Sequence, residues 1–71
     1  MRKISVRQAR DVDAPNAYAV TVTDEIGTTT HNVHTNAHGE GLWLDGQQVL
    51  GRAQFSAGRD PARAIRRYFE S

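Results

Sequence analysis

Three histidines lie close together at His31, His34 and His38, and imidazole is a side chain that binds zinc and transfers protons near neutral pH. A metal site needs ligands that converge on one point. On an extended strand His31 and His34 point to opposite faces, because side chains alternate with period two. His38 falls in a loop-like segment, and no H-E-x-x-H pattern is present. We therefore predict polar strand and loop histidines without a metal or cofactor; the alternatives are a weak metal site and a pH-sensitive contact.

The remaining residues do not have the spacing of a catalytic motif. The chain has no G-x-S-x-G nucleophile sequence and no glycine-rich phosphate loop. It also has no cysteine, which excludes disulfides and thiolate metal sites. The adjacent acids Asp24 and Glu25 fall in a predicted turn, where carboxylates are usually solvated. We therefore predict that the protein is not an enzyme.

Charge is unevenly distributed along the chain, although the formal net charge is only +1. Residues 1–10 carry four basic side chains and no acid, whereas residues 11–51 carry six acids and no lysine or arginine. Residues 52–71 carry five arginines and two acids. Two interpretations stay open. The basic ends neutralise the acidic middle in the fold, or they lie together as a patch for an anionic partner.

The best candidates for partner contact are the single tryptophan, Trp43, and the basic residues near the two ends. Tryptophan and arginine are over-represented among residues that dominate binding energy, although Trp43 could instead be a core residue and the arginines a solvated helix face. Lysine or arginine beside an aromatic ring would also suit single-stranded nucleic acid. The predicted partner-binding residues are Lys3, Arg7, Trp43, Arg63, Arg66 and Arg67.

A short helix is predicted to close the chain. Asp60 can cap its free N–H groups, and Pro61 suits the first helical position because it lacks an N–H. An apolar stripe, formed by Ala62, Ile65, Tyr68 and Phe69, repeats with the helical period. About ten residues are too few for a stable isolated helix, so this one must pack on a sheet.

Alternating apolar residues predict the strands of that sheet. The expected strands are residues 2–10, 18–25 and 28–35, followed by a hairpin of 42–44 and 47–50 that could extend to Phe55. Loops are expected at 11–17, 24–27 and 36–41, the last of them flexible. Asp45-Gly46 should form a type I′ turn, because both residues tolerate positive φ. If Leu42 and Leu44 pack under the helix, Trp43 lies on the opposite, open face.

The predicted architecture is therefore α+β, with a small antiparallel meander of four or five strands and one C-terminal helix packed on one face. Residues 1–71 are expected to form one domain. No apolar run approaches the length of a membrane span, and no signal-peptide pattern is present, so we expect a cytoplasmic protein without a membrane partner. The polar third strand leaves self-association through a sheet edge open.

One segment resembles known small proteins. A sheet followed by F-S-x-G-x-D-P-x-x-A-I is similar to several βββα modules, including antitoxin-like and integrase-arm types. The run Val49-Leu50-Gly51-Arg52-Ala53, followed by Asp60-Pro61-Ala62, resembles small phage anti-CRISPR proteins. That resemblance implies a non-enzymatic inhibitor that binds a CRISPR effector complex, and it transfers no site residue. Many such inhibitors are acidic mimics of nucleic acid, whereas this chain is near neutral.

The sequence thus predicts a small module that acts by binding. A protein partner is the leading interpretation, and nucleic-acid binding through the basic ends is the alternative. The oligomeric state and the identity of the partner stay open.

Overall fold

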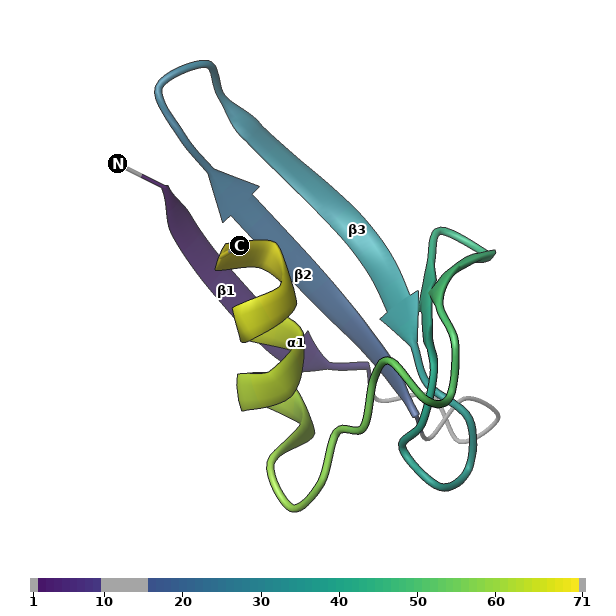
Figure 1. Ribbon diagram of the computed structural model, residues 1–71. Helices are drawn as coiled ribbons and strands as arrows, with labels where there is room; N and C mark the ends of the chain where they lie inside the picture. The colour runs from purple at the N-terminus through teal and green to yellow at the C-terminus, as the bar shows by residue number, and fades with distance from the viewer. Residues whose placement is uncertain (1, 10–15, 71) are drawn as a thin grey trace.

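The computed structural model describes residues 2–9 and 16–70. Its strands are β1 (Lys3–Gln8), β2 (Ala17–Thr23), β3 (Thr28–His34), β4 (Leu42–Leu44) and β5 (Gln47–Leu50), followed by the helix α1 (Pro61–Glu70). The strands form one antiparallel sheet in the order β1-β2-β3-β4-β5, and α1 lies across one face of it (Figure 1). The predicted α+β meander is therefore confirmed. Arg10 and most of the predicted 11–17 loop lie outside the described residues.

The alternation in the first strands places apolar side chains on the face under the helix. Ile4 lies opposite Val22, and Val6 lies opposite Val20. Val20 is fully buried and Ile4 nearly so. The core continues into the later elements, and its buried members are Ile4, Val20, Val33, Leu42, Phe55, Ala57 and Ile65.

Ile65 joins the helix to the sheet, and side chains at both ends of α1 satisfy backbone groups. Ile65 is fully buried. At the first turn, the Arg63 amide donates to Asp60 Oδ1 at 3.1 Å, as the predicted cap requires. At the last turn, Arg2 donates to the carbonyl of Phe69 at 2.9 Å, which places a cation at the negative end of the helix dipole.

The β4–β5 hairpin has the predicted turn. Asp45 and Gly46 both have positive φ, at 51° and 87°, as a type I′ turn needs. The predicted extension of this hairpin to Phe55 is wrong, because β5 ends at Leu50 and a turn stabilised by Gln54 follows. The pairing passes from Leu42↔Leu50 to Trp43↔Gln48, so β5 contains a bulge.

Two loops pair with each other and contribute to the core. The amide of Gly41 donates to the carbonyl of Phe55 at 3.0 Å, and the amide of Ala57 donates to the carbonyl of Gly39 at 2.7 Å. This short extended pairing buries Phe55 and Ala57. The 36–41 loop, predicted to be flexible, is held by Asn36, whose Oδ1 accepts two backbone amides within the loop. No helix in the described ranges has the length and apolar character that crossing a membrane requires.

We predict that Ile65→Ala will remove about 2–5 kcal/mol of unfolding free energy, because it leaves a cavity where helix and sheet meet. A domain of this size has roughly 4–10 kcal/mol in total, so the loss will be a large fraction. Urea unfolding followed by circular dichroism measures it. Ile26→Ala is the matched control, because Ile26 is 96% exposed. Equal losses in the two variants would contradict the assigned core.

Candidate binding surface

No helix or strand in the described part of the chain covers the face of the sheet opposite α1 (Figure 1), and we call it the open face. Side chains at alternate positions of β1 to β4 point to this face, and none of them is buried. Its members are Lys3, Ser5, Arg7, Ala17, Ala19, Thr21, Thr23, Thr28, Thr30, Asn32, His34 and Trp43. Hydroxyl, amide, cationic and aromatic groups therefore share one continuous surface.

The strand register orders these side chains into rows across the sheet. One row is Lys3, Thr23 and Thr28; the next is Ser5, Thr21 and Thr30; then Arg7, Ala19 and Asn32; then Ala17, His34 and Trp43. In the first row the two threonine hydroxyls lie 3.2 Å apart. The cations thus lie along β1, at one edge of the open face, and the aromatic rings lie at the other.

Trp43 stacks on His34, its cross-strand neighbour. The ring centroids are 5.1 Å apart and the planes differ by 12°. The indole also lies close to Gly41, where an added Cβ would be 3.0 Å from Trp43 Cζ3. Gly41 has φ of 73°, so both its backbone and this close approach favour glycine. Trp43 is half-buried and fixed in position, with Leu42 and Leu44 turned toward the helix.

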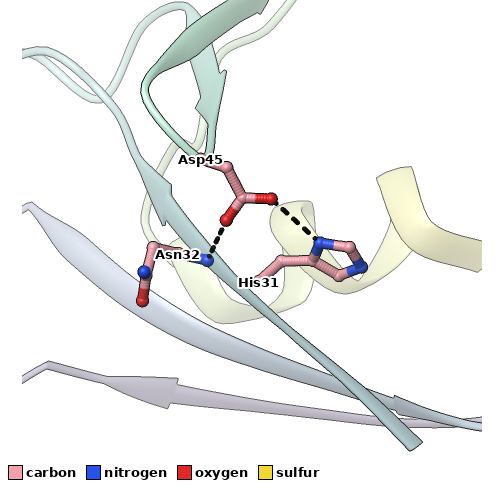
Figure 2. A network of polar contacts seen from close by, with 3 residues as sticks. All are labelled: His31, Asn32 and Asp45. Atoms are coloured by element: carbon pink, nitrogen blue, oxygen red, sulfur yellow. Dashed lines mark hydrogen bonds and ion pairs between the residues drawn. The ribbon is translucent and has the colours of Figure 1, made fainter.

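A polar network fixes the strand that carries Trp43. The carboxylate of Asp45 lies between two groups of β3 (Figure 2). Its Oδ1 accepts the amide of Asn32 at 2.9 Å, and its Oδ2 lies 3.2 Å from Nδ1 of His31. A carboxylate only accepts hydrogen bonds, so Nδ1 carries the proton in this contact. The imidazole of His31 also stacks on Phe69 of α1, with centroids 5.6 Å apart.

These contacts alter the acidity of Asp45. The hydrogen bond from the Asn32 amide, and then the one from His31, lower the pKa of this carboxyl group below its ordinary value. Hydrogen bonding to the charged form is the physical cause. The side chain is half exposed, at 53%, so water screens the effect.

The predicted partner-binding residues fall on two separate surfaces. Lys3 and Arg7 lie on the open face with Trp43, as predicted for a helix packed on the other side. Arg63, Arg66 and Arg67 belong to α1, across the sheet from Trp43. Trp43 and the three helix arginines therefore lie on opposite sides of the sheet.

The two ends of the chain contact each other where α1 packs on β1. Arg66 of α1 donates to the carbonyl of Ile4 in β1 at 2.6 Å. Ile4 is on an edge strand, so Arg66 covers a carbonyl that has no strand beside it.

Three aspartate carboxylates accept hydrogen bonds from backbone amides. Asp24 accepts those of Ile26 and Gly27, Asp45 that of Asn32, and Asp60 that of Arg63. These carboxylates therefore stabilise a turn, a strand pair and a helix start.

The histidines diverge as their spacing predicted. His31 lies on the helix side, opposite Val20, and His34 lies on the open face. Within the described part of the chain, no group of three or more His, Cys, Asp or Glu side chains could hold a metal ion.

Sequence reasoning did not identify His34 or Asn32 as members of the surface. The alternation of the third strand would have shown it, because Thr30, Asn32 and His34 follow one another at a spacing of two. No protein-family model matches the sequence, and no curated protein or solved structure is significantly similar to it.

The lowered pKa predicts a specific dependence of stability on pH. The stability that the Asp45 carboxylate contributes is present above the pKa of the unfolded chain, near pH 4, and is lost as pH falls through the lower folded-state pKa. Asp45→Asn keeps a residue that tolerates positive φ but removes the charge. The difference in urea midpoint between wild type and this variant should therefore be fully present near pH 6 and should shrink as the pH falls below about 4 through the lower folded-state pKa. A difference that is the same at every pH would contradict the assignment.

Proposed function

We propose that this protein is a non-enzymatic module that binds a protein partner through the open face. One observation carries the proposal: an uncovered sheet face presents a fixed aromatic pair, His34 and Trp43, in register with polar and cationic side chains. Aromatic and arginine side chains dominate binding energy at protein interfaces. Because the His34–Trp43 pair is already ordered, little side-chain entropy is lost when a partner covers it.

The area of the open face indicates that a stable interface must extend beyond it. Strands lie about 4.8 Å apart and rise about 3.4 Å per residue, so β1 to β4 present roughly 400 Å² in projection. A standard interface buries about 800 Å² on each partner. The partner must therefore reach beyond the flat face. The tip of the β2–β3 hairpin adjoins the row that contains Lys3, and there Ile26 is 96% exposed.

Two features favour protein over single-stranded nucleic acid. Nucleic-acid binding of this kind uses a track of cations and successive stacking rings. The described open face has two cations, Lys3 and Arg7, and the ring of Trp43 is already stacked on His34. The resemblance to anti-CRISPR proteins makes a CRISPR effector complex one specific partner to assay.

A pair of adjacent threonines tests the proposal. Thr30 and Thr29 are both exposed on β3, but they point to opposite faces of the sheet. The partner is captured from the native host with the wild-type protein, identified by mass spectrometry, purified and titrated by calorimetry; a purified CRISPR effector complex is titrated in parallel. Thr30→Arg should weaken binding at least tenfold, because it places a bulky cation in the middle of the open face. Thr29→Arg should change affinity by less than about twofold.

Equal effects of the two substitutions would contradict binding through the open face. One further outcome would show that the partner is a nucleic acid and not a protein. If the protein binds plain single-stranded oligonucleotides, with an affinity that falls log-linearly as salt rises, the nucleic-acid interpretation is correct.

A further inference from the structure

A second candidate site lies on the helix side of the sheet, away from the open face. A shallow depression there is lined by the side of α1 and the segment before it. Three arginines line it, Arg59, Arg63 and Arg67, together with Ser56 and Asp60. Three of the eight arginines of the chain thus surround one concave surface.

Helical spacing and the packing of α1 bring these residues together. Arg63 and Arg67 are four residues apart, so they lie one turn apart on the same side of the helix. Arg59 approaches from the segment that precedes the helix. Two other lining residues are alanines, which have small side chains. Ala57 is buried and Ala64 is half-buried. Arg66, by contrast, is directed to the Ile4 carbonyl and does not line the depression.

The charge of the depression defines the ligand. The described residues that line it include three guanidinium groups and one carboxylate, a formal charge of two positive units. The carboxylate of Asp60 accepts the Arg63 amide at 3.1 Å and so caps the helix itself. The ligand would therefore be held by side chains rather than by free helix amides. Glu40, whose backbone pairs with Ser56, is not among the lining residues.

We propose that this depression binds a phosphate monoester as its dianion. A phosphate monoester carries close to two negative charges at pH 7 and three acceptor oxygens. Guanidinium groups match those oxygens with paired hydrogen bonds, which ammonium groups do not provide. A carboxylate offers half the charge and one oxygen fewer, so it would make fewer charge-assisted hydrogen bonds with Arg59 and Arg63. The Ser56 hydroxyl adds a neutral donor at the edge.

Inorganic phosphate is the first probe. It is titrated into ¹⁵N-labelled full-length protein at pH 8 and constant ionic strength, with acetate in a parallel series. We expect saturable shifts of the amides of residues 56–60 and 63–67 with phosphate, and at least fivefold weaker binding of acetate. Arg63→Gln and Arg59→Gln should each weaken phosphate binding at least fivefold. Arg52→Gln is the matched control, because Arg52 is also exposed but lies outside the depression.

The control variant distinguishes phosphate binding in the depression from non-specific electrostatic attraction to the protein. Arg52→Gln removes the same charge, so the proposal expects phosphate affinity within about twofold of wild type. Equal weakening by Arg52→Gln and Arg63→Gln would overturn it, as would shifts that do not saturate or that centre on Lys3 and Arg7. These readouts differ from those of the open face, so either proposal can fail alone.

Two further ligands identify the source of the phosphate. A phosphoserine peptide and a 5′-phosphorylated oligonucleotide are each compared with their unphosphorylated forms. The proposal requires that at least one phosphorylated form binds at least fivefold more tightly than its unphosphorylated form, with the gain lost in Arg63→Gln. The phosphate comes from whichever ligand, peptide or oligonucleotide, gains more affinity on phosphorylation. No gain with either ligand would overturn the proposal.

Discussion

The carboxylate of Asp45 is the contact on which the position of the second half of the sheet depends. β3 and β4 pair at only two positions, Val33↔Leu44 and His34↔Trp43. Asp45 extends this short pairing, because its own amide donates to the Asn32 carbonyl at 2.7 Å and its Oδ1 accepts the Asn32 amide. A slip of one residue would exchange the two faces of β4 and would bury Trp43 in place of the leucines. The same carboxylate orients His31, which contacts Phe69, so one turn residue joins hairpin, sheet and helix.

Several charged side chains of this protein form hydrogen bonds with backbone groups of the fold itself. Asp24, Asp45 and Asp60 hold a turn, a strand pair and a helix start through backbone amides. Arg2 and Arg66 bind backbone carbonyls where the helix ends and where β1 has no neighbouring strand. The segregation of charge along the chain therefore leads to two basic surfaces on opposite sides of the sheet. Lys3 and Arg7 belong to the open face, whereas Arg59 and Arg63 belong to the depression beside α1.

The fold was predictable because its signals are local. Period-two alternation, the Asp45-Gly46 turn and the Asp60-Pro61 helix start each act within a few residues. The surface was only partly predictable. Alternation placed Lys3, Arg7 and Trp43 on one face, but the stacking of Trp43 on His34 depends on a register between segments that are distant in sequence. The burial of Phe55 and Ala57 likewise arises from pairing between two loops, and the bulge in β5 has no sequence signal that we recognise.

His34 and Trp43 stack on a sheet face that α1 does not cover, whereas His31 contacts α1 on the other face. A two-dimensional NOESY spectrum of the native protein measures both contacts at once. The structure predicts cross-peaks between the His34 and Trp43 rings and between the His31 and Phe69 rings. Cross-peaks between the Trp43 indole and the methyl groups of Ile65 would contradict it, because they would place Trp43 under the helix.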